Sequence, residues 1–308
     1  MPEPGLPYLS FSHWLRQRYG CAVRKISLNA GLGCPNKDGT VSREGCVFCD
    51  VNESGVDPER VHGHSIADQL SAEISRLRNG KTKAGKFIAY LQAGSNTHGP
   101  LEKLRDIYRQ ATAHPDVVSI SISTRPDCVT PEVLDLIGAM CSHLEVWIEL
   151  GVQSAHDSTL RRIGRHHDFA RVTEAARQIK SRNFLICLHL ILGLPEETRA
   201  MMVDTARAIN ALPIDAVKLH PLSITRGSRW AADWRPDKIP LMTETEYVAA
   251  AVDFLEALSP AIIIQRLTGG GRPEVHLAPD WCRHPHHTQR LIVEEFRRRG
   301  TRQGWRLK

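Results

Sequence analysis

The feature that most constrains the fold of this chain is a repeated change between short apolar runs and segments with helical periodicity. The apolar runs are rich in Ile, Leu and Val, as expected for parallel strands that are buried on both faces. They span residues 87–92, 117–124, 145–151, 185–193 and 215–222, after a weaker run at residues 25–28. From residue 87 on, their starts recur about every 28 to 40 residues, the length of a βαβ unit. The sequence therefore predicts an α/β fold, a partial (β/α)6 barrel, rather than a sandwich or a helical bundle.

The stretches between these runs carry signals for helix starts. Thr130-Pro131-Glu132 combines an N-cap, a proline at the first helical position and an acidic first turn. A seventh apolar run, residues 261–267, follows after a longer gap. No linker-like segment divides the chain. We therefore expect residues 1–225 to form the core barrel with its N-terminal segment, and residues 226–308 to form a C-terminal α/β extension packed on it.

Polar motifs follow the predicted strands, which is where barrels of this kind place their chemistry. A cysteine cluster follows the first strand, and Gln92 to Thr97 follow the second. The third strand leads into Thr124-Arg125-Pro126-Asp127, and the fourth carries Glu149 and then Gln153. We expect these side chains to meet at one end of the barrel.

The cysteine cluster is the strongest chemical signal. Cys34, Cys46 and Cys49 have the spacing C-x11-C-x2-C in a loop rich in Gly, Asn and Asp, whereas the other five cysteines are scattered. Soft thiolates suit an iron–sulfur cluster or zinc. Three thiolates would leave one iron of a cubane cluster open, whereas a structural zinc site needs a fourth ligand, for which His62 is the candidate. Both kinds of metal centre stay open at this point.

The basic excess of the chain lies in its C-terminal tail. The chain has 40 Lys and Arg against 34 Asp and Glu, and residues 281–308 alone hold eight of these cations and two of the acids. The tail combines an aromatic residue with basic ones: Arg297, Arg298, Arg299, Arg302, Trp305, Arg306 and Lys308. This pattern suits a nucleic-acid backbone, although a solvated end of an amphipathic helix explains it equally. No apolar run is long enough to span a membrane and no targeting segment is seen, so we expect no membrane partner and a cytoplasmic location.

The cysteine loop resembles the radical S-adenosylmethionine (SAM) superfamily, with a longer insertion than the common C-x3-C-x2-C spacing. The strings Cys34-Pro35-Asn36-Lys37-Asp38-Gly39-Thr40 and Gly45-Cys46-Val47-Phe48-Cys49 resemble the YhcC/YtqA-type bacterial family, which is related to the radical SAM half of the elongator catalytic subunit. The resemblance continues through Thr124-Arg125-Pro126-Asp127, Glu149-Leu150-Gly151-Val152-Gln153 and Lys218-Leu219-His220-Pro221-Leu222, and it covers about residues 10 to 295.

The resemblance implies a radical SAM barrel that holds a 4Fe-4S cluster and S-adenosyl-L-methionine. Cys34, Cys46 and Cys49 would be the cluster ligands, and reduction would cleave SAM to a 5′-deoxyadenosyl radical. The residues expected to bind the cofactor are Gln92, Asn96, Glu149, Gln153, Arg165, Gly193, Lys218 and His220. Among them, Glu149 and Gln153 match positions that hold the ribose hydroxyls, and Arg165 matches an arginine that pairs with the SAM carboxylate.

The elongator relation implies a substrate. It predicts modification of the side chain of a tRNA wobble uridine, with an electron donor such as flavodoxin or ferredoxin. Two alternatives remain: a radical SAM enzyme with a non-RNA substrate, and a non-catalytic, zinc-stabilised nucleic-acid-binding protein. The catalytic residue that would touch the substrate is not identified by the sequence.

Overall fold

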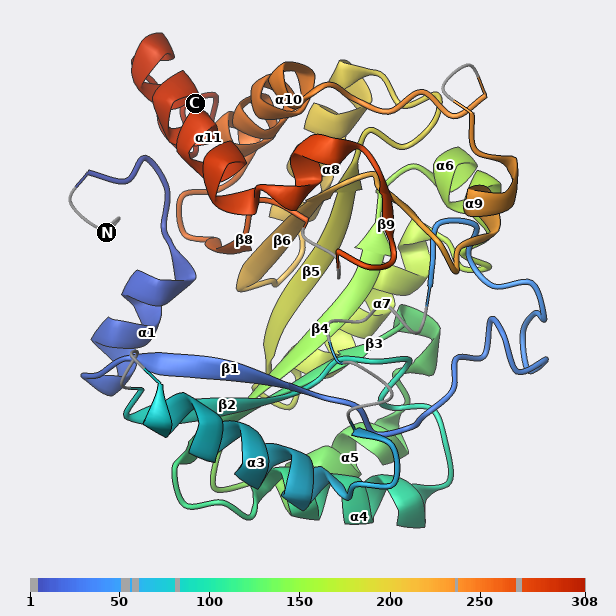
Figure 1. Ribbon diagram of the computed structural model, residues 1–308, viewed down its shortest axis with the longest axis vertical. Coiled ribbons are helices and arrows are strands. Elements are labelled where there is room, and N and C mark those ends of the chain that lie inside the picture. The colour runs from blue at the N-terminus through green and yellow to red at the C-terminus, as the bar shows by residue number, and fades with distance from the viewer. Residues whose placement is uncertain are drawn as a thin grey trace.

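A curled sheet of seven parallel strands forms the centre of the molecule (Figure 1). The computed structural model describes residues 5–50, 56, 61–80, 84–235, 238–269 and 273–307. The strands are β1 (Val23–Leu28), β2 (Lys86–Leu91), β3 (Val117–Thr124), β4 (Glu145–Gln153), β5 (Leu185–Leu192), β6 (Ala216–Pro221) and β8 (Ile263–Arg266). They pair in the order β1-β2-β3-β4-β5-β6-β8, and every pair is parallel. The predicted α/β partial barrel is confirmed, and the predicted seventh run becomes its last strand.

Helices connect the strands and cover the outer face of the sheet (Figure 1). They are α1 (Phe11–Tyr19), α3 (Ile66–Asn79), α4 (Leu101–Thr112), α5 (Pro131–Met140), α6 (Asp157–Arg162), α7 (Phe169–Lys180), α8 (Arg199–Asn210), α9 (Arg229–Asp233), α10 (Glu244–Ala257) and α11 (Pro285–Arg299). The start of α5 follows the sequence signal, because the Thr130 side chain accepts a hydrogen bond from the Val133 backbone N–H. A small antiparallel pair, β7 (Ile224–Thr225) and β9 (His276–Ala278), lies outside the main sheet.

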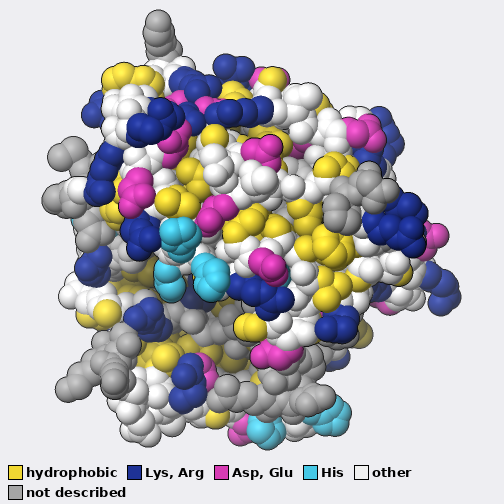
Figure 2. All heavy atoms as spheres, turned by 45° about the horizontal axis from the view of Figure 1, so that its top comes forward, with side chains coloured by type: hydrophobic (Ala, Val, Ile, Leu, Met, Phe, Trp, Pro, Cys, Tyr) yellow, Lys and Arg dark blue, Asp and Glu magenta, His cyan; other side chains and the backbone are white. Residues whose placement is uncertain are grey.

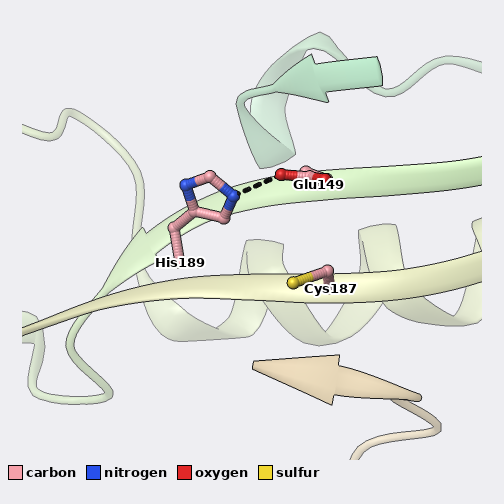
Figure 3. A group of neighbouring side chains, drawn as sticks. All are labelled: Glu149, Cys187 and His189. Atoms are coloured by element: carbon pink, nitrogen blue, oxygen red, sulfur yellow. Dashed lines mark hydrogen bonds and ion pairs between the residues drawn. The ribbon is translucent and has the colours of Figure 1, made fainter. Parts of the chain in front are cut away.

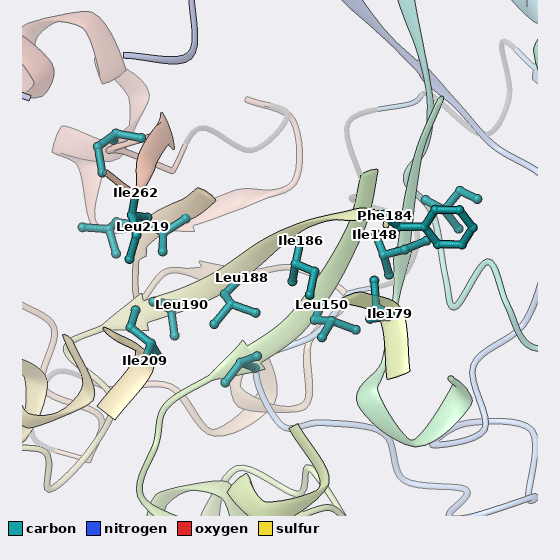
Figure 4. Close-up of a cluster of buried hydrophobic side chains, with 14 of the residues drawn as sticks. Ile148, Leu150, Ile179, Phe184, Ile186, Leu188, Leu190, Ile209, Leu219 and Ile262 are labelled. Carbon is teal, nitrogen blue, oxygen red and sulfur yellow. The ribbon is translucent and has the colours of Figure 1, made fainter. Parts of the chain in front are cut away.

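The largest hydrophobic core lies between the sheet and the helices (Figure 4). Alternate residues of the central strands, such as Ile148 and Leu150 on β4 and Ile186 and Leu188 on β5, are fully buried there. The other face of these strands points into the barrel. Because this outer layer supplies the packing, the barrel interior is left available for polar side chains.

A second apolar cluster lies inside the barrel near the starts of the strands. Trp147 of β4 packs there with Phe11 and Trp14 of α1, at ring-centroid distances of 5.7 and 5.5 Å. Edge-to-face packing of this kind suits aromatic quadrupoles. Helix α1 thus covers the end of the barrel opposite to the strand ends that carry the polar motifs.

The C-terminal tail packs against α10 and the N-terminal segment. Arg299 and Arg306 each form ion pairs with both Asp253 and Glu256 of α10. Arg298 pairs with Glu295, whereas Lys308 lies outside the described residues. On the face drawn in Figure 2, Lys and Arg side chains near the top lie beside Asp and Glu side chains. Half of the predicted cationic tail side chains are therefore neutralised within the molecule.

The C-terminal region is continuous with the barrel, because β8 pairs with β6 in the main sheet. The division at residue 225 stays a prediction. Among the described residues, no helix is both long and apolar enough to cross a membrane.

Candidate functional site

The loop after β1 carries the three clustered cysteines and brings their side chains near one another. Its turns are closed by the backbone N–H groups of Lys37 and Cys49, which donate to the carbonyls of Cys34 and Cys46 at 2.8 and 3.1 Å. The loop is fixed to the end of α6, since the Asn36 side-chain amide donates to the Gly164 carbonyl at 2.7 Å. Hydrogen bonds within the loop and to Gly164 therefore fix the loop that carries the cysteines.

The sulfur of Cys46 is buried and accepts two hydrogen bonds. The Asn36 side-chain amide and Arg165 Nη1 each lie 3.2 Å from this sulfur. Burial alone would raise the pKa of the Cys46 thiol, but the Arg165 guanidinium and Asn36 amide lower it below its ordinary value. Donors of this kind stabilise a thiolate ligand and tune a cluster bound to it.

The sulfurs of Cys34, Cys46 and Cys49 are near one another without forming a compact single-ion site. Burial, followed by the charges of Cys46 and Cys34, raises the pKa of the Cys49 thiol to about 12. Yet these sulfurs are not all within 4.8 Å of one another, nor does His62 complete such a group in the part of the chain that is described. Thiolates around one zinc would lie about 3.8 Å apart. Wider spacing fits a cluster better, because each thiolate then binds a different iron.

Arg125 supplies a second guanidinium beside the cysteines. Its Nε and Nη2 donate to both carboxylate oxygens of Asp127 at 2.9 and 2.8 Å, and Nη2 also donates to the Arg165 carbonyl. The thiols of Cys34 and Cys46 interact electrostatically with this guanidinium. Its Nη1 is buried, with no hydrogen-bond partner within the described residues. An orphaned cationic donor beside these two thiols fits an anionic group, such as a cluster sulfide or a carboxylate.

The segment after β2 packs directly on the loop residues that precede Cys34. Gly94 has a φ of +75°, and a Cβ there would collide with the Leu32 carbonyl oxygen, so only glycine fits. The Asn96 amide nitrogen donates to the carbonyls of Leu91, Ala93 and Ser123, while its Oδ1 is buried and has no partner among the described groups. The Gln92 side-chain carbonyl accepts from Ser27. Asn96 therefore braces two loops and retains one open acceptor.

Arg165 joins the cysteine loop to the end of β4. Besides Cys46, its guanidinium donates to the Gly151 carbonyl oxygen. Gln153 ends β4 with a φ of +76°, and its amide nitrogen and Arg165 Nη2 flank the position of a Cβ on Gly151 at 3.2 and 3.3 Å. The structure thus gathers Cys46, Arg165 and Gln153. Gly193 is not part of this group. It lies in a turn with a φ of +84°, beside the side chain of Met242.

Glu149 lies deeper in the barrel, within a polar layer. Its carboxylate is fully buried and accepts from Lys25 and Ser121 on one oxygen, and from Lys218 and His189 on the other. Burial would raise the pKa of Glu149, but the two ammonium groups and His189 hold it well below its ordinary value. All four donors bond to the carboxylate of Glu149. A ribose hydroxyl would have to replace one of them, and this contact stays a prediction.

The same layer contains unsatisfied donors. Lys218 Nζ lies 3.3 Å from the Tyr90 hydroxyl, and burial lowers its pKa to about 8 despite Glu149. The His220 Nε2 and Gln265 Nε2 atoms are buried without a hydrogen-bond partner among the described residues. Burial, together with Arg266, holds the pKa of His220 well below its ordinary value, so the ring is neutral. Lys218 and His220 thus lie in the polar layer inside the barrel, and their binding of the cofactor stays a prediction.

Glu149, Cys187 and His189 have ligand atoms within 4.8 Å of one another (Figure 3). His189 Nε2 lies 2.7 Å from Glu149, and Cys187 is the register partner of Glu149 on β5. Lys25 and Lys218 already compensate the carboxylate, so a further cation would meet two ammonium groups. Burial raises the pKa of Cys187, which keeps it a thiol. The arrangement favours a hydrogen-bonded cluster over a metal centre.

Several residues of these two groups are absent from the predicted site set, among them Lys25, Asn36, Arg125 and Gln265. Arg125 stands in a polar motif directly after β3, which is a signal that could have identified it. Lys25 is a charged residue within a strand, so its charge weakens the strand signal in the sequence. The sequence alone does not indicate that this cation points into the barrel. Asn36 and Gln265 acquire their roles only from contacts across the fold.

Comparisons with known proteins agree with this architecture. The model of the radical SAM superfamily matches residues 29–209, and that of the radical SAM C-terminal domain matches residues 214–298. The chain belongs to the radical SAM superfamily. Within it, the chain is 36% identical to YtqA of Bacillus subtilis over 299 residues, which cover 96% of this chain and 92% of YtqA. It is 39% identical to Escherichia coli YhcC over 275 residues, covering 87% and 85% of the two chains.

More distant proteins extend the comparison. The structure of Elp3 from the archaeon Methanocaldococcus infernus superposes with a TM-score of 0.72 at 15% identity, over 91% of this chain and 64% of that one. A tRNA-2-methylthio-N(6)-dimethylallyladenosine synthase of Nitratidesulfovibrio vulgaris is 24% identical over 77% of this chain and 52% of its own length. Radical SAM proteins use a 4Fe-4S cluster and SAM, and this chain is a radical SAM enzyme by fold and family.

Proposed function

We propose that Cys34, Cys46 and Cys49 hold the 4Fe-4S cluster, and that Arg125 and Arg165 receive the anionic part of SAM beside it. The observation that carries this proposal is the Cys46 sulfur, which accepts hydrogen bonds from Asn36 and Arg165. Beside it lies Arg125, whose Nη1 has no partner in the described part of the chain. When bound, the cluster and SAM supply a reductively generated 5′-deoxyadenosyl radical. The protein's part is to orient the cofactors and to exclude water from them.

Within this site, the two arginines have different tasks. Arg165 donates to Cys46 and to the Gly151 carbonyl, so its position is fixed and its charge stabilises the thiolate. The Nη1 group of Arg125 has no hydrogen-bond partner among the described residues, and its N–H groups suit a carboxylate oxygen. Gln153 at the end of β4 and the open Oδ1 of Asn96 are the further polar atoms that SAM would meet from the predicted set.

The substrate we propose is tRNA, at the side chain of a wobble uridine, with a flavodoxin- or ferredoxin-type electron donor. Support comes from relatives whose names concern elongator and tRNA chemistry. The ion pairs of Arg298, Arg299 and Arg306 weaken the case for the tail as the main RNA contact. A non-RNA substrate is the alternative that the experiments below distinguish.

The first experiment measures 5′-deoxyadenosine after anaerobic reconstitution with iron and sulfide, then addition of SAM and dithionite. We expect product from the wild-type chain and from Cys282→Ala, a matched control because Cys282 is a buried free cysteine in the turn Asp280–Arg283, outside the cysteine loop. Cys46→Ala should lose product and bound iron. Product from Cys46→Ala equal to the wild type, or stoichiometric zinc in place of iron, would refute the assignment of the cluster site.

A second experiment tests the substrate. Unmodified tRNA should increase 5′-deoxyadenosine formation, and mass spectrometry of digested tRNA should show a changed wobble uridine. The control is the same tRNA with cytidine at the wobble position. Stimulation by neither RNA, from protein that cleaves SAM, would reject tRNA as substrate and leave the radical SAM assignment standing.

A further inference from the structure

A cavity of about 600 Å³ lies in the seam between β1 and β8, the two edge strands of the curled sheet. Its lining combines α1, β1 and β8, and includes Phe11, Leu15, Lys25 and Gln265. Here it is called the seam cavity. Its volume falls in the range of small-molecule sites, and it could hold one nucleotide.

The lining of the seam cavity is strongly cationic. Arg16, Arg24, Lys25 and Arg266 contribute to it, and none of its described lining residues is acidic. Such a balance is unusual in a chain whose cations and acids are nearly equal in number. The charge of Lys25 is partly compensated by Glu149. The side chain of Arg266 forms no hydrogen bond or ion pair within the described chain, and its charge acts on Lys218, His220 and Tyr90.

A donor without a partner lies next to the same cavity, on the lining residue Gln265. Gln265 accepts from Lys25 at 3.0 Å through its Oε1, whereas its Nε2 is buried and has no partner in the described part of the chain. A buried donor without an acceptor costs about 1–3 kcal/mol. An anionic oxygen beside Gln265 and Arg266 would satisfy the donor and the charge together.

We propose that the seam cavity binds the phosphate of a nucleotide, with Arg266 and the Gln265 amide as its donors. Lys25 contributes its charge, since its three N–H groups donate to Ser121, Glu149 and Gln265. The rings and aliphatic side chains of Phe11 and Leu15 provide an apolar wall for the rest of the nucleotide. This inference rests on the proposed function, because it gives the nucleotide substrate a place within the same barrel. The phosphate belongs either to a free nucleotide or to a nucleotide within RNA, two sources that share the same chemistry.

The test is calorimetric titration of the reconstituted full-length chain with uridine 5′-monophosphate, uridine and a uridine-containing pentaribonucleotide. We expect the monophosphate to bind and uridine to bind at least tenfold more weakly. Arg266→Gln should weaken monophosphate binding about tenfold, the effect of losing one charge-assisted hydrogen bond. Arg297→Gln is the matched control, since it removes an equal charge from an exposed arginine of the tail. Gln265→Leu, similar in size, should also weaken binding.

Equal affinity for uridine and its monophosphate would overturn the proposal, as would equal losses in Arg266→Gln and Arg297→Gln. Tighter binding of the pentaribonucleotide than of the monophosphate, lost in Arg266→Gln, identifies RNA as the source of the phosphate. The reverse order identifies a free nucleotide. Cys46→Ala should keep monophosphate binding while losing 5′-deoxyadenosine, so failure of the cavity and failure of the proposed radical chemistry are separately visible.

Discussion

The C-terminal tail makes a stability prediction that separates a structural role from an RNA-binding role. Gln303 is 4% exposed and makes three hydrogen bonds far from its place in the sequence. Its Oε1 accepts from the Leu9 N–H at 3.0 Å, and its Nε2 donates to the carbonyls of Ser259 and Ile262 at 2.6 and 2.8 Å. The substitution Gln303→Ala removes all three while leaving the charge of the tail unchanged.

The expected loss follows from the partners left behind. Two of the bonds are part-buried, and at about 1 kcal/mol each they cost about 2 kcal/mol together. The bond to Ile262 is buried, and its orphaned carbonyl adds about 1.5 kcal/mol. The free energy of unfolding should therefore fall by about 3.5 kcal/mol, which is a large part of the stability of an ordinary domain. The urea midpoint should fall by roughly 1 M for a slope near 3 kcal/mol/M.

Urea unfolding followed by far-UV circular dichroism measures this loss. The matched control is Gln289→Ala, because the Gln289 amide also reaches the N-terminal segment, at the Tyr8 hydroxyl, but from an exposed position. The control should lose less than about 1 kcal/mol. A Gln303→Ala loss no larger than that of the control would refute the reasoning that the tail clamps the N-terminal segment. Unchanged stability with weaker tRNA binding would instead favour the RNA role.

Three further predictions concern the barrel. Arg165→Met should lower bound iron and reduce 5′-deoxyadenosine formation at least tenfold, since Cys46 loses a donor; Arg165→Lys should not restore it, because one ammonium does not reproduce the two-point contact. Lys218→Met should lower the free energy of unfolding, measured in urea, by about 3 kcal/mol. The same substitution should cost less in a chain that already carries Glu149→Gln, because residue 149 then has no buried charge to leave unpaired. Burial lowers the pKa of His189 from 6.5 to about 4, so the unfolded chain binds more protons in that window. Stability should therefore fall by up to about 3 kcal/mol as pH drops from 6.5 to 4, and His189→Asn should flatten this dependence.

The strands could be predicted because burial on both faces leaves a direct mark on the sequence. Continuous Ile, Leu and Val runs identified β2 to β6 and β8, and the N-cap at Thr130 identified the start of α5. The first strand looked weak, since Lys25 interrupts its apolar pattern. Its inward charge is tolerated only because Glu149 of β4 is its partner, and a contact between residues 124 positions apart leaves no periodic signal.

The cationic tail is a second case in which the sequence does not reveal a long-range ion pair. Local composition predicted an exposed basic surface, but Asp253 and Glu256 on α10 pair with Arg299 and Arg306. These acids lie 43 to 53 residues earlier in the chain, so only the packing of α10 on α11 places them there. A count of charge along the sequence therefore overstates the field of this surface.

Strand β4 connects the two polar regions of the barrel. At Gly151 its carbonyl accepts from Arg165, which also holds the Cys46 sulfur; two residues earlier, Glu149 accepts from Lys25, which lines the seam cavity. Two residues of a strand span about 7 Å. A phosphate held beside Lys25 would thus lie roughly one layer of side chains below the cysteine site. Since the rest of its nucleotide packs on Phe11 and Leu15 of α1, toward the other end of the barrel, a neighbouring nucleotide of the same RNA is the part that would cross this layer. This spacing would give an RNA whose phosphate is bound in the seam cavity access to chemistry at the strand ends, whereas a free nucleotide would stay below the layer of Glu149.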